Sequence, residues 1–149
     1  MSRPLLVLLL AGCYPATSRP GVEPVADAMT LEVELPVAEA TRALALALDA
    51  DSIPVRRTVP DDGWLESEWF DAVSLQPTRQ RPLGIGVVRV RAFVATGRAN
   101  HSVITLEAVY RVAADPSRPE RELERQISEG HPVHARIKRA LESLPHDEP

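Results

Sequence analysis

The sequence predicts an α+β domain: a single antiparallel sheet of about five strands, with two helices packed on one face, in the order β-α-β-β-β-β-α. Two observations predict this fold. Residues 30–35, 86–95 and 101–112 alternate polar and apolar side chains, which is typical of half-buried strands. Residues 37–50 and 132–144 repeat apolar residues every three or four positions, as amphipathic helices do. Every strand and helix has one apolar face, and a single sheet covered by both helices buries all of these apolar faces.

The first strand, 30–35, ends at Pro36, because proline has no backbone N–H to donate to a neighbouring strand. The helix over 37–50 is rich in alanine and leucine, which favour helix formation. Its apolar face is formed by Val37, Ala40, Leu44 and Leu48.

A hairpin follows this helix. Ile53 and Val55 open its first strand, and residues 61–63 form the turn, where Gly63 can adopt the positive φ that a tight hairpin requires. The returning strand is predicted to run unbroken over 64–71. Alternation divides its side chains between the core face (Leu65, Ser67, Trp69) and the opposite face (Trp64, Glu66, Glu68, Phe70).

The remaining residues predict a loop, a second hairpin and a helix. Residues 72–82 contain prolines and arginines without a period and are predicted to be a loop. The long hairpin of 86–95 and 101–112 follows. Residues 113–130 stay open, since their charged part fits either a short helix or irregular structure. The last helix begins at Pro132, a residue suited to a first helical position, and ends before Pro145.

The apolar faces of the strands together predict the sheet's side of the core. It comprises Leu31, Val33, Leu35, Ile53, Val55, Leu65, Trp69, Val88, Val90, Val94, Ile104, Leu106 and Tyr110.

The beginning of the chain indicates its location. A short basic stretch with Arg3 precedes an apolar run over 4–11 that has the length of a signal peptide and is too short to span a bilayer. The run closes with Leu10-Ala11-Gly12-Cys13, which resembles the lipobox of bacterial lipoproteins. The resemblance implies cleavage between Gly12 and Cys13 and lipidation of Cys13, which would anchor the chain in a membrane.

This reading divides the chain into four parts. Residues 1–12 are the signal peptide, and 13–28 are the lipidated cysteine and a Pro-rich tether with no apolar period. Residues 29–145 form the α+β domain, and 146–149 are a polar tail. In Gram-negative lipoproteins an Asp after the cysteine retains the protein in the inner membrane. Tyr14 at this position therefore implies the outer membrane, facing the periplasm, if the bacterium has one.

Composition and motifs exclude several function classes. The net charge of −4 offers no electrostatic footprint for nucleic acid. A single cysteine cannot form an intrachain disulfide. The sequence contains no phosphate-binding loop, nucleophile elbow, dinucleotide fingerprint or paired-cysteine motif. We therefore expect no catalytic residues, no metal and no cofactor.

The chain resembles the NlpB/DapX (BamC-like) family of lipoproteins in its lipobox, its Pro-rich tether and the order of its elements. The resemblance also rests on Leu35-Pro36, Leu44, Leu48 and the stretch Asp62-Gly63-Trp64-Leu65-Glu66-Ser67-Glu68-Trp69. The similarity covers residues 30–112. It implies a helix-grip domain, of which this chain has one where better-known members have two, and a role in outer-membrane assembly.

The sheet face opposite the helices is the candidate site. It mixes arginine and glutamate, which suits cross-strand ion pairs, with aromatic side chains that are favoured at protein interfaces. One hypothesis is a docking face for an envelope protein; the alternatives are a solvated sheet, self-association or lipid contact. The docking residues would be Trp64, Phe70, Arg89, Arg91, Phe93 and Val109.

Two other groups of side chains, a histidine pair and a set of carboxylates, are weaker candidates for a metal site or an acid–base site. His131 and His134 lie three residues apart at the start of the last helix and fit capping or surface roles better than a shared metal, because no third ligand is evident. The carboxylates at 61–62, Glu66 and Glu68 occupy a turn and a strand face, where a raised pKa for acid–base catalysis is not expected.

The chain is thus predicted to be a membrane-anchored, non-enzymatic interaction module of the bacterial envelope. The alternative is a carrier or sensor that holds a small apolar ligand between helices and sheet. Space for that ligand would come from Ala40, Ala43, Ala47, Ala92 and Ala108.

Overall fold

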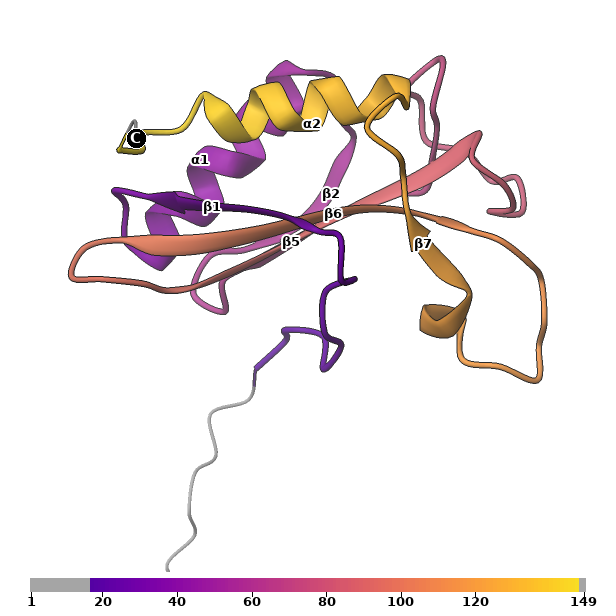
Figure 1. Cartoon of the computed structure of the whole chain (residues 1–149), viewed down its shortest axis with the longest axis horizontal. Coiled ribbons are helices and arrows are strands. Elements are labelled where there is room, and N and C mark those ends of the chain that lie inside the picture. The colour runs from indigo at the N-terminus through magenta and orange to yellow at the C-terminus, as the bar shows by residue number, and fades with distance from the viewer. Residues whose placement is uncertain (1–16, 148–149) are drawn as a thin grey trace, which may run out of the picture.

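A computed structural model describes residues 17–147. They form one antiparallel sheet with two helices on the same face, so the predicted α+β architecture is confirmed (Figure 1). The sheet has seven strands rather than about five, in the order β1-β6-β5-β3-β2, with β4 also paired to β5 and β7 to β6. The predictions for the signal peptide and Cys13 lie outside the described residues.

The elements follow the predicted order, with two short strands added. Their bounds are β1 Met29–Val33, α1 Val37–Ala50, β2 Val55–Val59, β3 Trp64–Ser67, β4 Phe70–Asp71, β5 Val87–Thr96, β6 Ser102–Arg111, the 3₁₀ helix η1 Glu120–Leu123, β7 Glu124–Gln126 and α2 Pro132–Glu142. The segment that the sequence left open thus contains η1 and β7, and β7 pairs with the end of β6.

The helices bury their predicted stripes against the sheet. Helix α1 buries Ala40, Leu44 and Leu48, and α2 buries Val133, Ile137, Ala140 and Leu141. Opposite them, eight of the thirteen predicted sheet residues are fully buried, and Leu31, Leu35, Val55 and Tyr110 pack at its margin. Trp69 is the exception.

A β-bulge between β3 and β4 explains that exception. Trp64 lies opposite Phe93, and an unbroken register would place Trp69 opposite Val88. Phe70 occupies that position instead. One extra residue before β4 therefore reverses which side chains face the core.

The bulge exchanges the roles of two aromatic residues. Phe70, predicted for the docking face, lies fully buried in the hydrophobic core, and Trp69, predicted for the core, is half-buried and stacked by arginines of the opposite face. Both predictions are wrong for this one reason. Ser67 satisfies the backbone at the bulge, because its hydroxyl accepts a hydrogen bond from the N–H of Val90 (2.9 Å) and donates one to the carbonyl of Glu68 (2.7 Å).

Residues 17–28, here called the N-terminal strap, cross the sheet face opposite the helices before entering β1 (Figure 1). The sequence predicts a free tether over 13–28, but the described part of that range is bound to the domain. Arg19 and Val25 contact strands β5 and β6, Ser18 contacts the turn before β3, and Glu23 contacts η1. None of the helices within residues 17–147 is long and apolar enough to cross a membrane.

Candidate functional site

The predicted docking face is largely covered by the chain itself. Trp64, Phe93 and Val109 are buried, and Arg91 is only 8% exposed. The strap covers one part of this face, and η1 with β7 covers another (Figure 1). The face therefore presents these apolar side chains to the protein's own segments rather than to solvent.

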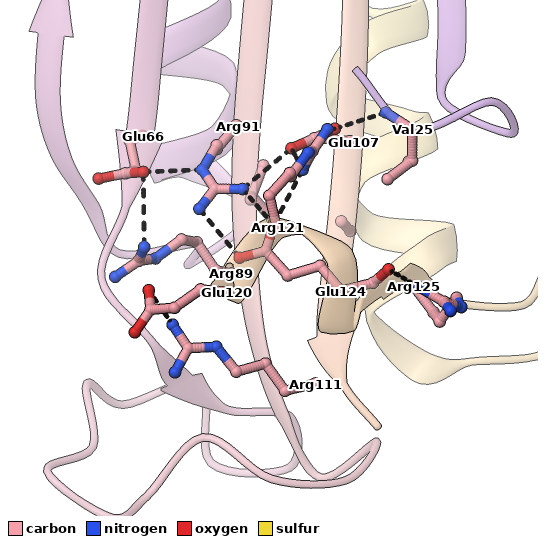
Figure 2. A network of polar contacts seen from close by, with 12 residues as sticks. Val25, Glu66, Arg89, Arg91, Glu107, Arg111, Glu120, Arg121, Glu124 and Arg125 are labelled. Carbon is pink, nitrogen blue, oxygen red and sulfur yellow. Dashed lines mark hydrogen bonds and ion pairs between the residues drawn. The ribbon is translucent and has the colours of Figure 1, made fainter. Parts of the chain in front are cut away.

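Arg91 on β5 is the centre of a buried ion-pair network (Figure 2). Its Nε donates to Oε2 of Glu66 (2.8 Å) and its Nη1 to Oε1 of Glu107 (3.1 Å), residues that lie directly opposite it on β3 and β6. Nη1 and Nη2 also donate to the two carboxylate oxygens of Glu124 on β7 (2.8 and 3.1 Å). This two-point geometry is the strongest form of an arginine–carboxylate pair.

Arg121 on η1 joins the network to the strap. It donates to Oε2 of Glu107 (2.7 Å), to Oε2 of Glu124 (2.9 Å) and to the carbonyl of Glu23 in the strap. Glu107, which is fully buried, also accepts the backbone N–H of Val25 (2.9 Å). One carboxylate therefore connects β5, η1 and the strap.

The cluster is electrically balanced. Arg89, Arg91 and Arg121 face three glutamates, Glu66, Glu107 and Glu124. Burial alone would raise the pKa of Glu124, but hydrogen bonds and charge from Arg91, and then from Arg121, leave it lowered. Burial likewise opposes the charge of Arg91, yet its hydrogen bonds to Glu124 and Glu66 raise its pKa. A general acid needs a raised pKa, so Glu124 is suited to hold its charge rather than to transfer a proton.

Trp69 closes one edge of the network. The guanidinium carbons of Arg89 and Arg111 lie 4.5 Å and 5.0 Å from the centre of its ring, so both cations stack on the indole. The Nε atoms of these two arginines are buried and find no hydrogen-bond partner among the described residues. Arg111 also pairs with Glu120 at 2.5 Å.

The beginning of the strap binds the other end of the face. The carboxylate of Asp62 accepts the backbone N–H (2.6 Å) and hydroxyl (2.7 Å) of Ser18, and that hydroxyl accepts the indole N–H of Trp64 (3.4 Å). Arg19 donates to the carbonyl of Val94 (3.1 Å) and stacks on Phe93 at 5.4 Å. Asp62, which the sequence places in the turn before β3, thus binds the beginning of the strap.

We expect this contact to be lost at low pH. Hydrogen bonds from the backbone and side chain of Ser18 lower the pKa of Asp62 below its ordinary value of 3.8. The stabilisation is therefore present above pH 3.8 and disappears as the pH falls through the lower folded value. In an NMR titration, the indole N–H resonance of Trp64 should shift across that interval and should lose this shift in Asp62→Asn. Equal titrations in both proteins would contradict the assignment.

No protein-family model, curated protein or solved structure matches this chain. The resemblance to the NlpB/DapX family therefore stays a prediction, and the site must be interpreted from its own geometry.

His131 is the N-cap of α2, as the capping interpretation predicts. Its Nδ1 accepts the N–H of Val133 (3.2 Å), and its Nε2 lies 2.9 Å from the carbonyl of Ile85. The neutral tautomer with the proton on Nε2 satisfies both contacts. Since both ring nitrogens are engaged, His131 offers no free ligand atom to share with His134.

Replacing this cap should destabilise the domain measurably. His131→Ala removes both contacts and should lower the free energy of unfolding by about 1–2 kcal/mol, as measured by urea denaturation. His134→Ala is the matched control, because the side chain of His134 makes no hydrogen bond among residues 17–147; it should change stability by less than about 0.5 kcal/mol. Equal losses would contradict the capping role.

One group of possible metal ligands was not predicted. Donor atoms of Glu34, His101 and Asp147 lie within 4.8 Å of one another, and the hydrogen bond and charge of Asp147 raise the pKa of Glu34. Sequence reasoning missed the group because it assigned Asp147 to a polar tail, whereas a hydrogen bond from the N–H of Glu34 to the carbonyl of Pro145 (3.0 Å) holds that tail beside β1. Asp147 already pairs with Arg98 at 3.0 Å.

Proposed function

We propose that this chain is a bacterial envelope lipoprotein, anchored through a lipid on Cys13, whose domain acts as a non-enzymatic interaction module. The observation that carries the proposal is the lipobox Leu10-Ala11-Gly12-Cys13 after an apolar segment of signal-peptide length. Envelope assembly at the outer membrane is the role that the family resemblance favours. The partner would be another envelope protein.

The strap supports a refinement of this proposal. Because the strap is bound to the domain, only three residues lie between Cys13 and Thr17, the first described residue, so the two are four residue steps apart. At about 3.5 Å per residue, that stretch spans at most roughly 14 Å. A free tether of fifteen residues would reach roughly 50 Å. The proposed module therefore stays close to the membrane surface instead of extending away from it.

Fractionation of cells tests the anchor. The wild-type chain should sediment with membranes and be released only by detergent, while Cys13→Ser should lose lipidation. Tyr14→Ser is the control, because it alters the neighbouring residue and leaves the lipobox intact. Chemical cross-linking in wild-type membranes should then yield a discrete adduct with an envelope protein. If detergent were still needed to release Cys13→Ser from membranes, the anchor would be wrong.

A second function, binding of a small ligand, is favoured by one cleft. Of the five alanines predicted to leave space for that ligand, Ala40, Ala92 and Ala108 are buried in the hydrophobic core, and Ala43 and Ala47 pack against it. A cleft of about 550 Å³ lies instead where α2 begins, bordered by Met29, Ile85, Tyr110, Ile127 and both histidines of the pair. That volume is within the usual range for ligand sites. Native mass spectrometry of the protein purified from cells would detect a retained ligand, and Tyr110→Ala should reduce its occupancy.

A further inference from the structure

The exposed aliphatic side chains of the described residues gather at one end of the sheet. Five large ones are exposed, and four of them, Val73 (87%), Ile85 (60%), Val112 (48%) and Leu83 (47%), lie in the β4–β5 loop or just after β6. The fifth, Leu46 (72%), is on α1. Large apolar side chains that gather at one exposed site mark an interaction surface.

Backbone hydrogen bonds hold these segments together. The N–H of Ala72 donates to the carbonyl of Gly86 (2.9 Å), which closes the β4–β5 loop. The N–H of Gly84 donates to the carbonyl of Arg111 (2.8 Å), which fixes the loop against the end of β6. Both segments lie at the right-hand end of the sheet in Figure 1. We call this surface the end patch and define it by Val73, Arg79, Arg81, Leu83, Ile85 and Val112.

The loop that forms most of the end patch carries only positive side-chain charge, although the chain as a whole is acidic. Residues 72–86 contain Arg79 and Arg81 and no acidic residue, while the whole chain has a net charge of −4. Both arginines are exposed. The next arginines along this end, Arg111 and Arg118, are paired with Glu120 and Glu122. Arg79 and Arg81 form no such pair within residues 17–147, so their charge remains available.

We infer that the end patch contacts an anionic phospholipid surface. Arginine binds phosphate oxygens through two parallel hydrogen bonds, and exposed aliphatic side chains can enter the boundary between headgroups and acyl chains. The inference rests on the proposed function in one respect: the lipid on Cys13 places a membrane within reach. The strap begins near Asp62, at the opposite end of β3 and β5 from the end patch. Anchor and patch can therefore touch one bilayer when the strands lie along its plane.

Vesicle flotation without the lipid anchor tests the patch alone. The probe is residues 13–149 with Cys13→Ser, a chain that retains every strand and helix of the domain. Vesicles of equal parts phosphatidylglycerol and phosphatidylcholine should bind it, and pure phosphatidylcholine should bind it far less. Because each arginine near an anionic surface contributes about fivefold, Arg79→Ser with Arg81→Ser should weaken binding roughly 20-fold.

Matched variants separate charge from apolar contact. Val73→Ser with Ile85→Ser should weaken binding several-fold on the same vesicles. Leu46→Ser replaces an aliphatic side chain on α1 whose exposure lies between those of Val73 and Ile85, and it should bind like the parent. Circular dichroism checks that each variant is folded. The inference is overturned if the parent does not bind anionic vesicles, or if the double arginine variant and Leu46→Ser bind equally well. Either result leaves the fractionation test of Cys13 unaffected, so the two proposals fail separately.

Discussion

Arg91→Met should be the most damaging substitution of a charged residue in this domain. It removes the guanidinium that serves Glu66, Glu107 and Glu124 and leaves buried carboxylates without their main partner. Breaking a buried ion pair from one side costs about 3–5 kcal/mol. Because domains are stable by only about 5–15 kcal/mol, urea denaturation should show a large part of the stability lost.

The control for this prediction is an arginine of similar connectivity on the surface. Arg98 pairs with Glu32 (2.7 Å) and Asp147 (3.0 Å), but its side chain is 64% exposed. Arg98→Met should therefore change the free energy of unfolding far less than Arg91→Met does. Equal effects of Arg91→Met and Arg98→Met would show that the buried network contributes no more to the free energy of unfolding than a surface ion pair does.

Gly63→Ala should be about as damaging as Arg91→Met, because two separate costs coincide at this turn. Gly63 has a φ of +64°, a conformation that costs an L-residue about 1–2 kcal/mol. A Cβ here would also lie 2.3 Å from the carbonyl oxygen of Val94 and 2.9 Å from Cγ1 of Val37. Relieving that overlap must move β5 or the start of α1, so the total loss should reach about 3–5 kcal/mol.

Gly84→Ala isolates the conformational cost. Gly84 also has a positive φ, +81°, but a Cβ at this position would meet nothing within 4 Å. Its loss should stay near 1–2 kcal/mol, measured by the same urea denaturation. Similar losses at Gly63 and Gly84 would mean that the close approach of Val94 does not matter.

The sequence predicts this fold well wherever local periodicity is unbroken. Strands β5 and β6 and both helices lie where alternation and the three–four spacing predict them. The pairing of Glu66, Arg91 and Glu107 also follows from alternation, since residues opposite each other share a face. Periodicity gives the wrong faces between Ser67 and Phe70. A single extra residue there exchanges the side chains that face the core with those that face away from it, and the composition of the strand does not reveal this.

The candidate site was predicted only in part, because its cover comes from segments without a period. The strap has the composition of a linker, and part of its attachment is made by backbone groups of Glu23 and Val25, which carry no sequence signal. Arg121 and Glu124 belong to the segment that the sequence left open, yet they complete the network around Arg91. The predicted exposed docking face is consequently a closed face.

The intact mass of the protein extracted from cell membranes tests the central proposal most directly. We expect a mature chain that begins at Cys13 and carries the added mass of a diacylglycerol and a further acyl chain at this residue. A chain that retains residues 1–12, or one that begins at an unmodified Cys13, would contradict the proposal.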